Sequence, residues 1–124
     1  MALPLSYASN WELLLIFIGR RRRFRVTGNS MYPTLEVDNV VLIDEGAYRH
    51  RLPAVGDIVV AYHPHRPNLR VVKRVQTISS DGQCFLIGDN PSPSESTDSR
   101  SFGVIPLKNI IGQVTSKLKE THEM

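Results

Sequence analysis

The sequence is poor in the residues that most often build disulfides and metal sites. It contains one cysteine, Cys84, so no disulfide can form within the chain and nothing indicates an oxidising compartment. Paired cysteines and a His-Glu-x-x-His motif are both missing, and His63 with His65 is a weak metal signal alone. We therefore expect no metal and no cofactor, and a Cys84 that is a small buried side chain in an apolar run.

Long hydrophobic runs are also missing. The apolar stretch Trp11–Ile18 contains Glu12 and is far shorter than the roughly 20 residues of a membrane-spanning helix. Basic residues follow this stretch, whereas a secretory signal has them in front. The pattern predicts a short helix capped by Ser9 or Asn10 and packed on the body, with a helix lying at a membrane surface as the alternative.

Positive charge is concentrated directly after this stretch. The net charge is +3, and five arginines fall within Arg20–Arg25. Such a cluster suits phosphates of lipid headgroups or nucleic acid, or it is a solvated junction between two elements. We expect a cytoplasmic protein without a spanning segment, with membrane-surface contact through Trp11–Ile18 and Arg20–Arg25 as a possible addition.

The remaining sequence reads as short strands separated by turn residues. The β-branched or alternating runs are 24–27, 39–44, 56–62, 69–77, 83–88 and 109–118. With 124 residues and no alternating helices, the chain predicts one mainly β domain, a small folded antiparallel sheet or barrel with a short N-terminal helix. The expected parts are an N-terminal helix and arginine cluster (1–23), a body (24–118) that would hold any site, and a tail (119–124). The Ser- and Pro-rich stretch Pro91–Ser101 has the composition of a loop.

A lone serine follows a glycine turn directly after the first strand-like run. Ser30 is not in a Gly-x-Ser-x-Gly elbow, because Tyr32 occupies the last position. The only Ser-x-x-Lys sequence, Ser116–Lys119, lies in a strand pattern at the chain end. All histidines fall in loop-like stretches or the tail, so a histidine base is not favoured, although the chain order of a triad is free.

Lys73 is a candidate partner for this serine. It lies in an alternating apolar run, where Val71, Lys73 and Val75 share one face and Val72 and Arg74 share the other. If the first face is the core, burial lowers the lysine pKa, and at a pKa of about 8 roughly one amine in ten is neutral at pH 7. A neutral amine can accept a serine proton. The opposing interpretation is a lysine on a solvated face.

Four segments together resemble the signal peptidase I family of serine–lysine proteases. They are Gly28 to Leu35 (Gly-Asn-Ser-Met-Tyr-Pro-Thr-Leu), Asp38 to Val59, Val72 to Val75, and Gly88 to Pro106 with its Ser-Thr-Asp-Ser-Arg box. The resemblance implies an endopeptidase in which Ser30 is the nucleophile, Lys73 the general base and Ser96 the hydroxyl that orients the amine. It also implies an oxyanion site at the Ser30 N–H, with Gly28 where some members carry a hydroxyl donor, and an ion pair between Asp98 and Arg100. The implied scaffold of the site comprises Met31, Pro33, Arg74, Gly88, Asp89, Asn90, Asp98, Ser99 and Arg100.

The chain departs from the membrane members of that family in its short N-terminal stretch and its extra residues between Asn90 and Ser96. In its small size and its lack of a spanning stretch it resembles the small nickel-type superoxide dismutase maturation proteases, which implies a precursor substrate with an N-terminal extension. Alternatives are a membrane-associated signal peptidase and a self-cleaving repressor-type domain. The Asp98-Ser99-Arg100 box is evidence against the repressor-type domain. A nucleic-acid-binding module is not expected, because it would have no use for Ser30 and Lys73 together.

Overall fold

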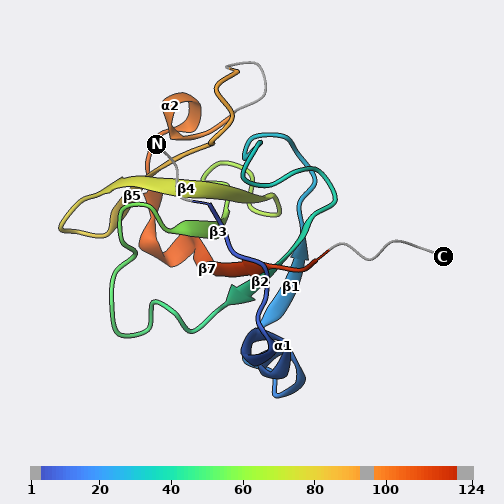
Figure 1. Ribbon diagram of the computed structural model, residues 1–124. Coiled ribbons are helices and arrows are strands. Elements are labelled where there is room, and N and C mark those ends of the chain that lie inside the picture. The colour runs from blue at the N-terminus through green and yellow to red at the C-terminus, as the bar shows by residue number, and fades with distance from the viewer. Residues whose placement is uncertain (1–3, 93–96, 120–124) are drawn as a thin grey trace.

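Seven strands form one antiparallel sheet that curls around the middle of the molecule (Figure 1). The computed structural model describes residues 4–92 and 97–119. The strands are β1 (Arg22–Arg25), β2 (Val40–Asp44), β3 (Ile58–Tyr62), β4 (Arg70–Ile78), β5 (Gln83–Ile87), β6 (Ile105–Pro106) and β7 (Ile110–Lys117). Their order in the sheet is β1-β2-β7-β3-β4-β5-β6. The helical elements are α1 (Asn10–Phe17), α2 (Ser99–Phe102) and the 3-10 turn η1 (Leu107–Asn109), with α1 and α2 at opposite ends of the view.

The prediction of a mainly β chain with a short N-terminal helix is confirmed. Each of the six expected runs overlaps a strand, although β1 begins two residues before the run 24–27. Two short elements, β6 and α2, were not expected, because neither is long enough to show a periodic pattern and α2 begins inside the Ser- and Pro-rich stretch.

The central strand β3 is buried on both faces. Ile58 and Val60 pack in one apolar cluster, and Val59 and Ala61 pack in a second cluster on the other face. The curl of the sheet covers both sides, which explains why this run is uniformly apolar and does not alternate. Cys84 lies fully buried in the second cluster, as expected.

Helix α1 is attached to the sheet mainly through Glu12. The helix is capped by Ser9, one of the two expected caps, whose hydroxyl accepts a hydrogen bond from the Glu12 N–H at 3.2 Å. The Glu12 carboxylate accepts a bond from the Thr115 hydroxyl of β7 at 2.5 Å and pairs with Arg21 at 3.1 Å. Burial acts to raise the pKa of Glu12, but the bonds from Thr115 and Arg21 outweigh it and lower that pKa. The charged residue inside the apolar stretch is thus the anchor of the helix.

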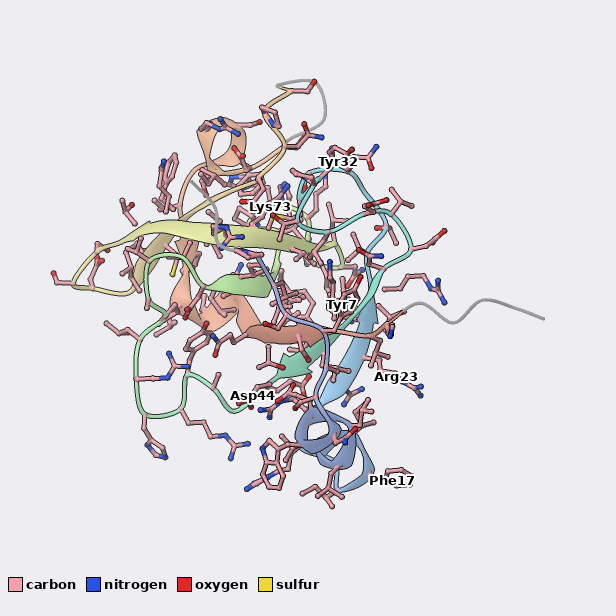
Figure 2. All side chains as sticks on the ribbon, viewed as in Figure 1. Tyr7, Phe17, Arg23, Tyr32, Asp44 and Lys73 are labelled. Atoms are coloured by element: carbon pink, nitrogen blue, oxygen red, sulfur yellow. The ribbon has the colours of Figure 1, made fainter. Side chains whose placement is uncertain are left out.

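The apolar side chains of α1 are mostly exposed. Leu15 is the buried residue of the helix, whereas Trp11 is 63% exposed and Phe17 is 91% exposed. Figure 2 shows Phe17 at the outer end of α1, directed away from the sheet. Across residues 4–92 and 97–119, no helix has the length and apolar character needed to span a bilayer.

Gly112 is required in β7, next to the point where the pairing with β3 shifts register. A Cβ atom added there would lie 2.6 Å from both the Asp44 carbonyl oxygen and a methyl group of Ile43. Real side chains do not approach a backbone so closely, so any larger residue must push β2 away from β7.

We therefore expect Gly112→Ala to lower the free energy of unfolding by about 1–3 kcal/mol, the usual cost of overpacking. Thermal denaturation followed by circular dichroism measures this loss. Gly46→Ala is the matched control, because the atom nearest its added Cβ is the mobile Arg49 side chain at 3.4 Å. Equal melting temperatures for the two variants would contradict the assignment.

Candidate functional site

Ser30 lies in a turn that is held by contacts on both sides. The turn follows β1, and Met31 and Leu35 are buried in the first apolar cluster. The backbone N–H of Asn90 donates to the Ser30 carbonyl at 2.9 Å, and the Asn90 side chain donates to the Asn29 carbonyl at 2.8 Å. The serine is therefore fixed from within by apolar packing and from outside by the turn that follows β5.

Lys73 is buried in the middle of β4. Lys73 is 3% exposed, and it lies opposite Val59 of β3 in the strand register. Burial lowers the pKa of the Lys73 amine to about 8, while the Asp98 carboxylate acts to raise it and the Arg100 guanidinium acts to lower it. Figure 2 shows the side chain on β4 near the loop that carries Tyr32. About one amine in ten is then neutral at pH 7.

Ser30 and Lys73 line the same cleft. Its volume is about 630 Å³, and Gly28 and Met31 also contribute to its wall. The two residues that the sequence analysis paired, 43 positions apart in the chain (73 minus 30), thus contribute to the wall of one surface hollow. A hydroxyl and an amine with a lowered pKa in one cleft are the parts of a nucleophile and its base.

Arg74, next to Lys73, is buried on the opposite face of β4. Its guanidinium donates to both carboxylate oxygens of Asp89 at 2.9 Å and to the Gly56 carbonyl at 2.8 Å. The Thr34 hydroxyl donates to the same carboxylate at 2.6 Å. Asp89 therefore links the lysine strand to the turn that carries the serine, and a bidentate arginine–carboxylate pair fixes this geometry.

Asp98 is held almost without exposure beside the end of β5. The ion pair expected with Arg100 is present, with the closest atoms 2.6 Å apart, and the Gly88 N–H donates to Asp98 at 2.8 Å. Ser99 accepts a bond from the Leu86 N–H at 2.9 Å. Burial acts to raise the pKa of Asp98, but the bonds from Arg100 and Gly88 outweigh it and lower that pKa.

Arg100 has a further electrostatic effect through this ion pair. A bare Asp98 carboxylate would favour the protonated form of Lys73. The guanidinium opposes that attraction, so the ion pair helps to keep the amine poised for deprotonation.

The remaining expected residues are placed unequally. Pro33, joined to Tyr32 by a cis peptide bond, is exposed at the turn and does not line the cleft. Ser96, the hydroxyl expected to orient Lys73, lies outside the described residues. Thr97, Ser101 and Phe102 also line the cleft, although the sequence analysis did not select them. Serines and threonines recur throughout this stretch, and nothing in their order in the sequence indicates which of them line the cleft.

His63 and His65 also line the cleft, which the sequence analysis did not foresee. Their rings lie edge to face at 5.9 Å, and His63 packs on Phe102 at 4.6 Å between ring centres. Burial lowers the pKa of His63, and the positive charges of Arg66, His65 and Lys73 lower it further. Within the described part of the chain, no group of three or more His, Cys, Asp or Glu residues is arranged to hold a metal ion.

Comparison with known proteins places the fold and cleft in a family. A sequence profile described as "Signal peptidase, peptidase S26" matches residues 11–81 and 76–118. The chain is 33% identical to the mitochondrial ATP-independent inner membrane protease subunit 1b of Arabidopsis thaliana, over 70% of this chain and 63% of that protein. It is 32% identical to the mitochondrial inner membrane protease subunit 1 of Xenopus tropicalis, over 71% and 63%, and 28% identical to a probable signal peptidase I-1 of Synechocystis sp., over 81% and 71%.

The match thus spans less than two thirds of the length of the first two of these proteins. The family profile nevertheless extends from α1 to the end of β7 and includes both cleft residues, Ser30 and Lys73. The chain therefore belongs to the signal peptidase family, peptidase S26.

Proposed function

We propose that this protein is an endopeptidase that works with a Ser30–Lys73 dyad and removes an N-terminal segment from a protein precursor. The observation that carries the proposal is the Lys73 amine, buried in the cleft that Ser30 also lines, with its pKa lowered to about 8. Burying an amine in this way destabilises the fold at neutral pH by at most about 3 kcal/mol. A catalytic role for the amine explains why that cost is retained.

The reaction would proceed through an acyl-enzyme. Neutral Lys73 accepts the Ser30 hydroxyl proton as Oγ attacks the carbonyl carbon of the scissile peptide bond. The oxyanion that results accepts a hydrogen bond from the Ser30 N–H. As the carbon–nitrogen bond breaks, the protonated amine of Lys73 gives its proton to the leaving amine. A water molecule, deprotonated in turn by Lys73, then attacks the ester carbon, and Lys73 passes this proton to Ser30 Oγ as the ester bond breaks.

Two strand edges favour an extended substrate. β1 is at one end of the strand order, and β4 pairs with β5 only from Arg74 to Ile78, so residues 70–73 have one strand partner within the described chain. Both edges border the cleft, through Phe24 and Val26 on one side and Val71 on the other. A peptide lying between them would gain backbone hydrogen bonds next to the dyad.

The candidate precursor is a nickel-type superoxide dismutase with its N-terminal extension, as the sequence resemblance implies. A second candidate is a signal peptide cleaved at a membrane surface, and one observation favours it. The exposed apolar residues of α1, including Trp11 and Phe17, are followed by exposed Arg22 and Arg23. Apolar side chains beside cations are typical of helices that rest on anionic lipid.

Co-expression with the nickel superoxide dismutase precursor tests the dyad. Mass spectrometry is expected to show removal of the extension by the wild type, and no removal by Ser30→Ala or Lys73→Met. Lys108→Met, at an exposed lysine of η1, is the matched control and should retain activity. Cleavage by either dyad variant refutes the mechanism, whereas an intact precursor with the wild type removes only this substrate.

The rate should also follow the titration of Lys73. Because the neutral amine is the active form, kcat/KM is expected to rise about tenfold per pH unit below the pKa and to level off above about pH 8. Arg100→Gln should move the midpoint to higher pH, because the Asp98 carboxylate then attracts the lysine proton with less opposition. A profile with an unmoved midpoint in this variant would show that the ion pair does not tune the base.

Membrane contact is tested by co-sedimentation with vesicles. Wild-type protein should pellet with vesicles of mixed phosphatidylserine and phosphatidylcholine, and the double variant Trp11→Ser, Phe17→Ser should stay in the supernatant. Val55→Ser, at an exposed apolar residue remote from α1 in sequence, is the control. Wild-type protein that remains in the supernatant would speak against the second candidate.

A further inference from the structure

The cleft that Ser30 and Lys73 line has charged side chains of one sign among its described residues. Besides Lys73, these are Arg66 and Arg70, with the imidazoles of His63 and His65 beside them, and none of the described lining residues is an aspartate or a glutamate. The charge comes mostly from the connection between β3 and β4, which ends on Arg70. A substrate segment in the cleft therefore meets cations and no competing carboxylate among the described residues.

This positive wall continues beyond the cleft into a second hollow. The second hollow has a volume of about 370 Å³ and shares Phe24, Thr27 and Arg70 with the first. Arg23 and Arg25 also line it, again with no acidic residue among the described lining. The two hollows thus form one basic groove that leads from Ser30 and Lys73, past Phe24, to the arginines of β1.

Several of these guanidinium groups are available for a ligand. Arg23, Arg66 and Arg70 are exposed and have no carboxylate within ion-pair distance in the described part of the chain. Arg70 lies over the Phe24 ring, 4.9 Å from its centre, so its position is held by an aromatic face while its donors remain exposed. By contrast Arg21, Arg74 and Arg100 are each paired with a carboxylate.

We propose that this groove selects acidic polypeptide, and that Arg66, Arg70 and Arg23 bind aspartate or glutamate side chains of the precursor near the scissile bond. The proposal rests on the proposed function, because it takes the groove as the path of the substrate. Arg70 is three residues from Lys73 along β4, a distance of roughly 10 Å for a strand. The two side chains start from opposite faces of β4, but both line the cleft at the edge of the strand that β5 does not pair. An acidic side chain about three residues from the cleaved bond would therefore reach Arg70. Carboxylates favour the groove because guanidinium forks bind them with two hydrogen bonds.

A binding measurement tests the proposal independently of cleavage. Fluorescein-labelled peptides of twelve residues, made of Ala and Ser with either four Glu or four Gln at alternating positions, are titrated against Ser30→Ala protein and followed by anisotropy. The Glu peptide should bind about tenfold more tightly, and Arg66→Gln and Arg70→Gln should each weaken it about threefold to fivefold, as for exposed ion pairs. Arg49→Gln, at an exposed arginine outside the groove, is the control and should change nothing.

The outcomes separate the two proposals. Equal affinity for the Glu and Gln peptides, or an unchanged affinity in both groove variants, overturns the acidic preference even if the precursor is cleaved. Selective binding of the Glu peptide supports the preference even if no precursor is cleaved and the proposed function fails. A labelled thymidine 12-mer is the third ligand, and tighter binding of this oligonucleotide with the same dependence on Arg66 and Arg70 would overturn the choice of polypeptide.

Discussion

The site depends on an amine kept out of water without a carboxylate that fully compensates it. Burial lowers the pKa of Lys73, and the carboxylate that acts to raise this pKa, Asp98, is bound by Arg100. If Asp98 were unpaired, its charge would raise the pKa of the Lys73 amine with less opposition. The fold thus keeps a buried carboxylate close to the cleft while limiting its influence on the amine.

The second requirement is that two loops from distant parts of the chain meet over one strand. Asp89 joins them, since it binds Arg74 of β4 and Thr34 of the serine turn, and Asn90 adds bonds to the same turn. Buried polar groups of this kind carry a large cost if one member is lost. The same contacts that position the serine therefore also join the turn after β1 to β4 and to the segment that follows β5.

Much of this arrangement was accessible from the sequence, and the failures have physical causes. The strand runs, the cap at Ser9 and the burial of Cys84 follow from local pattern, because each depends on near neighbours in the chain. The burial of Arg74 beside a buried Lys73 was not foreseen, since an alternating strand normally has one wet face. Its partner Asp89 follows β5, and a contact between residues far apart in the sequence produces no periodic pattern from which it could be predicted. The basic groove was missed for the same reason, because Arg23 and Arg70 come together only when β1 and β4 are placed.

The neighbours Lys73 and Arg74 give the pairing of β4 an unusual consequence. Their side chains occupy opposite faces, one with a base that can be neutral and the other with a guanidinium that keeps its charge. A slip of one residue between β4 and β3 would exchange the two faces and set a permanent cation beside the serine. A misaligned chain of this protein would therefore lack an amine of lowered pKa beside Ser30, so the cleft acquires its paired hydroxyl and amine only with the native alignment of β3 and β4.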